Sequence, residues 1–172
     1  MLGSMTSLKR SITRSDVLLT LAGVAFAVFF GISVSADEGA PWTFTPVLAL
    51  VPLALLWRRV APIGALCGIT TAIGLSVALF GTYTRCGLFL PVDFLLVFAA
   101  SARLPWRLAV AGWALALSAA LLMLGFDQSA PLDEAGVFVG VLVTAAWAAG
   151  LALRAVAHAS SEPAVTFEPA RT

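Results

Sequence analysis

Long apolar runs, separated by short polar gaps, follow one another along most of the chain. Each run approaches the roughly 20 residues that an α-helix needs to cross the hydrocarbon core of a bilayer. The gaps are short, so consecutive helices are expected to be antiparallel neighbours with no soluble domain between them. The pattern predicts six transmembrane helices, with approximate bounds Val17–Ser35, Pro41–Trp57, Pro62–Thr82, Gly87–Ala102, Trp106–Phe126 and Ala135–Ala157.

Three local features add detail to this pattern of helices. Thr13, Ser15 and Asp16 precede the first run and offer oxygen atoms that can cap its free N–H groups. The second run contains Pro52, where we expect a kink or a broken turn because proline cannot donate a helical hydrogen bond. The fourth run contains Pro91 and Asp93, and it matches a uniform apolar helix less well than the others.

Composition supports a location in lipid. Hydrophobic residues make up 60% of the 172 positions, charged residues only 11%, and the mean hydropathy is +1.01. Soluble domains carry about 25% charged residues and have too little interior to hide so many apolar side chains. The sequence therefore predicts an all-α, polytopic membrane helix bundle.

The basic residues indicate how such a bundle would be oriented. With the N-terminus inside and six spans, nine of the ten basic residues fall in cytoplasmic segments and only Arg85 lies outside. Short cytoplasmic loops are enriched in Lys and Arg, so this distribution favours six spans with both termini in the cytoplasm. The expected organisation is a cytoplasmic segment 1–14, a membrane domain 15–158 and a disordered cytoplasmic tail 159–172 in the plasma membrane.

Asp93 is the main candidate for a ligand or polar site, because ionisable residues inside a span are costly and are often functional. Pro91 frees a backbone carbonyl nearby, and Arg85 could reach back toward the carboxylate. The alternative is a carboxylate close enough to the membrane edge to stay hydrated.

Two further sets of residues are candidates for contacts. Gly64 and Gly68 in the third span, and Gly136 and Gly140 in the sixth, have the spacing that allows close helix packing, either inside one bundle or between copies. The second set comprises the basic cytoplasmic turns. These turns are expected to set the topology and to contact anionic lipid headgroups, and they contain Arg58, Arg59, Arg103 and Arg107.

The sequence contains no recognisable catalytic motif. The chain lacks hydrolase, zinc-protease, P-loop and dinucleotide-binding motifs, and its single histidine and two isolated cysteines do not form a metal-ligand pattern. We therefore expect no enzyme activity, no catalytic residue, no cofactor, no metal and no nucleic-acid partner.

The turn Leu55-Leu56-Trp57-Arg58-Arg59-Val60-Ala61-Pro62, set between two apolar helices, resembles the N-terminal membrane region of actinobacterial sensor histidine kinases. The stretch Phe94–Arg107 fits the same region. The resemblance implies a membrane sensory module. It does not extend to a kinase core: after the last span the sequence holds Pro163 and Pro169 in place of a dimerisation helix, and it contains no ATP site.

These observations together predict a sensory or scaffold module that acts through a membrane or cytoplasmic protein partner, or as a homo-oligomer. The alternative is a small-solute binding or transport subunit of a membrane complex. A sealed, ligand-sized pocket would favour the transport subunit, whereas a tight bundle with an exposed small-residue face would favour the module.

Overall fold

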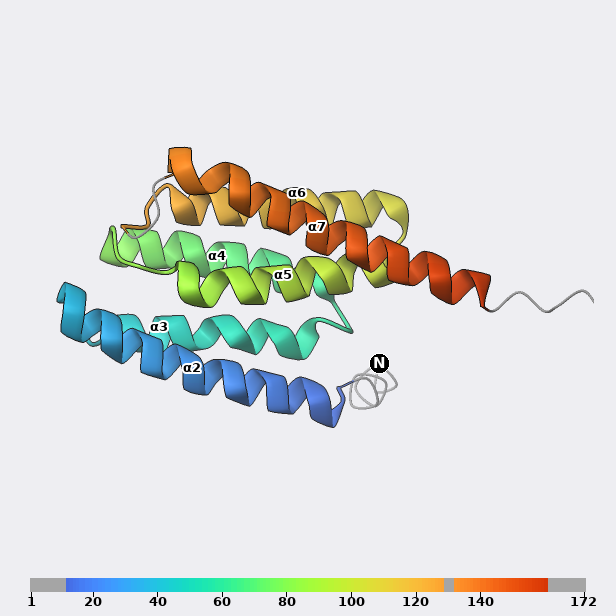
Figure 1. Ribbon diagram of the computed structural model, residues 1–172. Helices are drawn as coiled ribbons and strands as arrows, with labels where there is room; N and C mark the ends of the chain where they lie inside the picture. Colours follow the sequence, from blue (N-terminus) through green and yellow to red (C-terminus); the bar gives the residue numbers. More distant parts are fainter. Residues whose placement is uncertain (1–11, 129–131, 161–172) are drawn as a thin grey trace, which may run out of the picture.

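The computed structural model describes residues 12–128 and 132–160, which form helices joined by short turns (Figure 1). The predicted N-terminal segment 1–14 and tail 159–172 lie almost entirely outside these residues. The helices are α2 (Arg14–Glu38), α3 (Phe44–Leu50), the 3₁₀ helix η1 (Val51–Trp57), α4 (Pro62–Phe80), α5 (Cys86–Arg103), α6 (Trp106–Leu124) and α7 (Leu132–Ala159). The all-helical prediction is confirmed for this part of the chain.

The second predicted helix breaks where proline was expected to break it. α3 ends at Leu50, and the chain continues as the 3₁₀ helix η1 with Pro52 in its first turn. Proline supplies no backbone N–H, so the regular α-helical ladder cannot pass through this position. The bounds of the other helices differ from the predicted ones by only a few residues.

Helix α5 lies at the centre of the bundle and contacts α2, η1, α4, α6 and α7. Figure 1 shows the α2 and α3 pair on one side of it and the α6 and α7 pair on the other. Leu96, Val97 and Ala100 of α5 are fully buried. α2 begins and α7 ends at the same end of the bundle.

The outer surface of the bundle is strongly apolar. Phe29, Val137 and Phe138 are 69%, 77% and 64% exposed. Within the described residues, four helices are long and apolar enough to cross a membrane: α2, α4, α6 and the part of α7 from Ala135. α3 and η1 together form a shorter apolar helix, Phe44–Trp57. A surface of this kind is stable in hydrocarbon, and it indicates a membrane protein.

Close helix packing depends on glycines that the sequence analysis did not select. A Cβ added to Gly150 of α7 would lie 2.0 Å from Ser101 Oγ and 2.5 Å from the carbonyl oxygen of Phe98, so α5 and α7 approach closely there. On α2, Gly23 and Gly31 approach Pro52 and Thr45 in the same way. A small residue every fourth position, Gly23, Ala27 and Gly31, was a signal that could have identified this face of α2.

Candidate functional site

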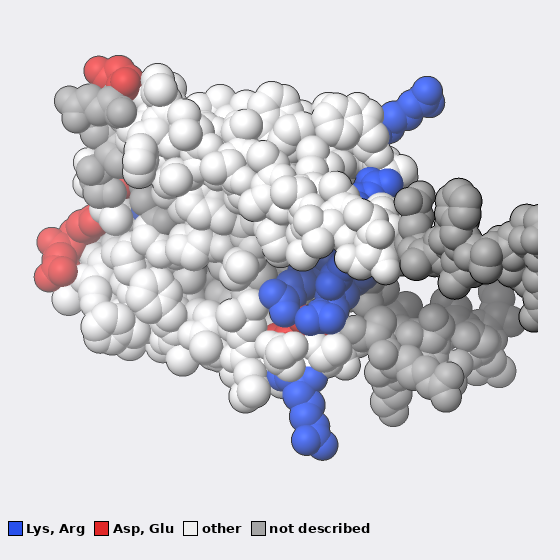
Figure 2. All heavy atoms as spheres, turned by 45° about the vertical axis from the view of Figure 1, so that its right-hand side comes forward, with Lys and Arg blue, Asp and Glu red and all other residues white. Residues whose placement is uncertain are grey.

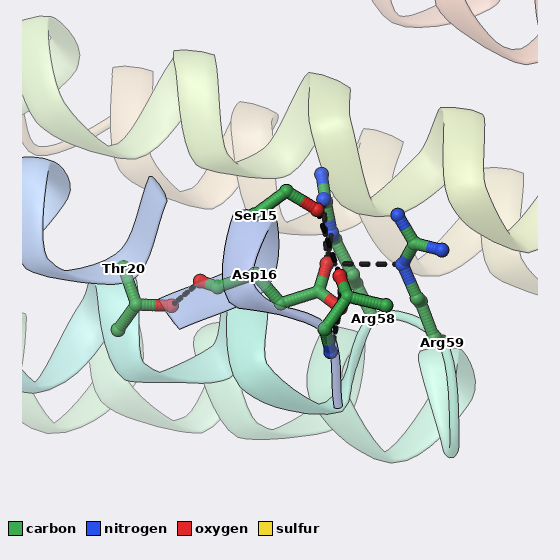
Figure 3. A network of polar contacts seen from close by, with 6 residues as sticks. Ser15, Asp16, Thr20, Arg58 and Arg59 are labelled. Carbon is green, nitrogen blue, oxygen red and sulfur yellow. Dashed lines mark hydrogen bonds and ion pairs between the residues drawn. The ribbon is translucent and has the colours of Figure 1, made fainter. Parts of the chain in front are cut away.

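Asp16 is the centre of a polar cluster at the end of the bundle where α2 begins (Figure 3). Its side chain is fully buried, and Oδ1 lies 2.6 Å from Nη2 of Arg58. The Nε–H groups of Arg58 and Arg59 donate to the same oxygen at 2.7 and 3.0 Å. One carboxylate therefore joins the start of α2 to the turn that follows η1.

Local structure holds the Asp16 carboxylate in place. The Thr13 backbone N–H and hydroxyl both donate to Oδ2, at 3.0 and 2.7 Å, and Thr13 is the N-cap of α2. The capping role expected from the sequence is therefore present. The ion pair with two arginines was not foreseen, because Asp16 and Arg58 are far apart in the sequence.

Charge is separated between the two ends of the molecule. Figure 2 shows blue arginine side chains gathered toward one end, while most of the red acidic side chains lie at the opposite end. Asp16 lies at the start of α2 with its partners Arg58 and Arg59, while Glu38 lies at the other end of α2, next to the turn that Asp127 contacts. This separation agrees with the expected distribution of loop charges.

Arg85 is fully buried at the acidic end. An arginine side chain carries five N–H donors, and here they meet five acceptors. The acceptors, at 2.7–3.3 Å, are Ser76 Oγ and the backbone carbonyls of Ser76, Gly81, Tyr83 and Phe126. The Arg85 backbone N–H also donates to Asp127 Oδ2 at 2.6 Å.

These contacts make Arg85 a structural link. Burial lowers its pKa, and the charges of Asp127 and Glu38 raise it; an arginine remains protonated in either case. Its guanidinium also lies 5.4 Å from the centre of the Phe44 ring, within the range of a cation–π interaction. Arg85 thus connects the α4–α5 and α6–α7 turns.

Asp93 is only 2% exposed, and neither carboxylate oxygen has a hydrogen-bond partner among the described residues. The structure therefore does not pair it with Arg85, in contrast to the sequence expectation. Nor does it place Asp93 at a hydrated edge. The reason is that the donors of Arg85 are occupied by Ser76 of α4 and by backbone carbonyls of the adjoining turns, while Asp93 lies on the central helix α5.

Gly64 and Gly68 line an open groove and do not pack against another helix. A Cβ added to Gly68 would meet nothing within 4 Å, and one added to Gly64 would meet only Ala61, at 3.6 Å. The groove, of about 600 Å³, lies between η1 and α4. We call it the η1–α4 groove; its lining residues are Leu50, Val51, Leu53, Ala54, Trp57, Ala61, Gly64, Ala65, Gly68, Ile69, Thr71, Ala72 and Leu75.

Gly136 and Gly140 have a different setting. An added Cβ at Gly140 would lie 3.7 Å from Leu117 of α6, and one at Gly136 would lie 4.0 Å from Leu121. These are ordinary van der Waals distances, so the two glycines permit normal packing of α7 on α6 without unusually close approach.

Three of the four arginines predicted in basic turns come together. Arg58, Arg59 and Arg103 line one pocket, which Arg154 of α7 completes. Arg107 is exposed and does not line it. Arg154 was assigned to the cytoplasmic side from the sequence, but its position on the last helix gave no indication of this neighbourhood.

No group of three or more His, Cys, Asp or Glu side chains within the described residues is arranged to hold a metal ion. The fold and these polar clusters define only a broad class of protein, an apolar helical bundle with charged ends. No family model, curated protein or solved structure matches the chain. The resemblance to sensor-kinase membrane regions therefore stays a prediction.

Proposed function

We propose that this protein is a membrane-embedded sensory or scaffold module that acts through a partner protein and performs no chemistry of its own. The observation that carries the proposal is the η1–α4 groove. Gly64 and Gly68 lower the intrinsic stability of α4, since glycine in a helix costs about 0.5–1 kcal/mol relative to alanine. Nothing in the described part of the chain uses the space that they leave.

The occupant that fits this groove is a transmembrane helix of the partner. The groove follows α4 from Ala61 to Leu75, which is roughly 20 Å or about four helical turns. Its floor consists of Gly64, Gly68 and Ala72, and small residues at this spacing let two helix backbones approach closely in lipid. The acyl chain of a lipid has no helix backbone to bring close, so it would gain little from small residues at this spacing.

The turn that resembles sensor-kinase membrane regions forms one end of the groove. Trp57 and Ala61 line it, while Arg58 and Arg59 between them reach Asp16. A partner helix in the groove would therefore touch the same turn that ties α2 to the bundle. This proximity supports a role in which a conformational change is transmitted between α2 and the partner.

The alternative, a solute-binding or transport subunit, would require a closed pocket at a polar group. The three pockets described for the bundle are the η1–α4 groove, a shallow surface between α6 and α7, and the arginine pocket. Asp93 lines none of them. Six spans, cytoplasmic termini and the plasma membrane as location are part of the proposal.

Photocrosslinking in native membranes tests the proposal. Leu75 and Leu79 lie one turn apart on α4 and are 49% and 60% exposed, but only Leu75 lines the groove. With p-benzoylphenylalanine in place of Leu75, we expect a covalent adduct with another polypeptide. The same probe in place of Leu79 is the control and should yield little or none.

A second variant checks that the groove itself is responsible. Gly68→Ile adds a side chain where the structure has open space, so it should preserve the protein level and abolish the adduct at Leu75. Equal adducts at both positions, or an adduct that survives Gly68→Ile, would contradict docking in the groove. An adduct with the mass of two copies would replace the partner with self-association.

A further inference from the structure

The pocket at the Asp16 end of the bundle collects positive charge from three separate places in the chain. Arg58 and Arg59 come from the turn after η1, Arg103 from the end of α5 and Arg154 from α7. The pocket has a volume of about 330 Å³. Figure 2 shows that blue side chains are gathered toward this end of the bundle.

Acidic groups compensate only part of this charge. Within the described residues, Asp16 is the only carboxylate in an ion pair with these arginines, and it pairs with Arg58 and Arg59. Arg103 lies within electrostatic reach of Arg58 and Arg59, which repel it, and of Asp16, which attracts it. Four cations around one pocket with a single anion leave a site that favours a further negative group.

Three of the four arginines are held in position by other contacts. Arg58 and Arg59 are fixed on Asp16, and Nη1 of Arg154 donates to the backbone carbonyl of Leu104. Each of these side chains carries more N–H donors than these contacts use. A phosphate group accepts such donors in pairs, and arginine is well suited to bind it.

The rest of the pocket is apolar. Along α5 its wall runs from Arg103 back to Leu95, about 12 Å at the rise of an α-helix, and Phe98 and Leu153 contribute to it. A cationic mouth joined to an apolar wall matches a molecule whose phosphate adjoins a hydrocarbon chain. It does not match a free inorganic ion equally well.

We infer that this pocket binds the phosphate group of an anionic phospholipid, with the arginines around the headgroup and the apolar wall against the start of an acyl chain. The inference is independent of the partner docking at the η1–α4 groove. Basic pockets between transmembrane helices are known to hold anionic headgroups. Occupation of this pocket would connect η1, α5 and α7 at one end of the bundle.

Native mass spectrometry of the full-length protein in detergent tests the inference. The probes are phosphatidylglycerol and phosphatidylcholine with identical acyl chains, and inorganic phosphate is added as competitor at constant ionic strength. We expect the protein to retain phosphatidylglycerol in preference to phosphatidylcholine. Loss of one arginine near an anionic lipid weakens binding about fivefold, so Arg103→Gln should lower the apparent affinity by that factor.

Arg107→Gln is the matched control, because Arg107 lies close to Arg103 in the sequence but does not line the pocket. It should weaken the binding of phosphatidylglycerol much less than Arg103→Gln does, because Arg107 lies outside the pocket. Arg154→Gln provides a second pocket variant with the same expected loss, and circular dichroism verifies that each variant remains helical. Displacement of the lipid by inorganic phosphate would assign the site to free phosphate and overturn the lipid assignment.

The absence of a preference for phosphatidylglycerol would overturn the inference. So would an equal loss of affinity in Arg103→Gln and Arg107→Gln, since it would show that general surface charge, and not the pocket, attracts the lipid.

Discussion

Asp16 Oδ1 lies 2.6 Å from Nη2 of Arg58, and this ion pair ties the start of the first described helix to the turn between η1 and α4. The carboxylate is fully buried, whereas the Arg58 side chain is 17% exposed. An ionised carboxylate is costly to bury unless it is paired and hydrogen-bonded. Asp16 meets that condition through Arg58, Arg59 and Thr13.

The first prediction concerns this cluster. Asp16→Asn keeps the shape of the side chain but removes its charge, and it leaves Arg58 and Arg59 close together without a counter-ion. We expect the free energy of unfolding to fall by about 1–2 kcal/mol, less than for a fully buried pair because the arginines remain partly in contact with solvent.

Thermal unfolding in detergent micelles measures this effect. Asp37→Asn is the control, because Asp37 lies on the same helix and is exposed; its midpoint should be unchanged. Equal midpoints for the two variants would show that the Asp16 cluster does not stabilise the bundle.

The second prediction concerns Arg85. Its side chain has five hydrogen-bond acceptors in the α4–α5 and α6–α7 turns and at Ser76. Arg85→Gln should lower the free energy of unfolding by about 3 kcal/mol, because several buried carbonyls lose their donors. Arg107→Gln, at an exposed position, should change it by less than about 0.5 kcal/mol.

The third prediction separates Arg85 from Asp93. The two side chains share no hydrogen bond and are eight residues apart along α5, about 12 Å at the rise of an α-helix, so the effects of Arg85→Gln and Asp93→Asn on unfolding should add to within about 0.5 kcal/mol in the double variant. The measurement is a double-mutant cycle by thermal or denaturant unfolding. A coupling energy well above that value would indicate an interaction between them that the structure does not contain.

The fourth prediction compares two glycines. Gly150→Ala would push its methyl group against Ser101 and the Phe98 carbonyl, so it should separate α5 from α7 and destabilise the bundle. Gly68→Ala meets open space and should stabilise α4 by about 0.5–1 kcal/mol, the propensity difference between the two residues. An unfolding midpoint that does not fall for Gly150→Ala would contradict the packing described for α5 and α7, and one that falls for Gly68→Ala would contradict the open space at Gly68.

Much of the helical architecture could be predicted from the sequence. Charged residues and prolines separate the apolar runs and so mark the ends of the helices. A charged side chain is costly in hydrocarbon, and proline cannot donate a helical hydrogen bond. The break at Pro52 follows from a missing backbone donor, and the fourth run, predicted as Gly87–Ala102, forms the helix Cys86–Arg103. The number of membrane crossings depends on the short α3–η1 segment and stays a prediction.

The polar contacts could be predicted only in part. The basic residues were assigned to one side of the membrane, but the partner of Arg58 is Asp16, which looked like a capping residue alone. Which face of a helix packs inward was equally hard to predict, because the long helices carry large apolar side chains on their exposed faces as well as on their buried ones. For that reason Gly64 and Gly68 were selected as packing residues, while Gly150 makes the close contact.

Cysteine labelling in intact cells tests the proposed six-span topology most directly. In a protein with Cys67→Ser and Cys86→Ser, a membrane-impermeant maleimide should modify Gln128→Cys from outside. It should modify Ser160→Cys only after the membrane is permeabilised; both positions are exposed in the bundle. Modification of Ser160→Cys in intact cells, or protection of Gln128→Cys, would contradict six spans with both termini in the cytoplasm.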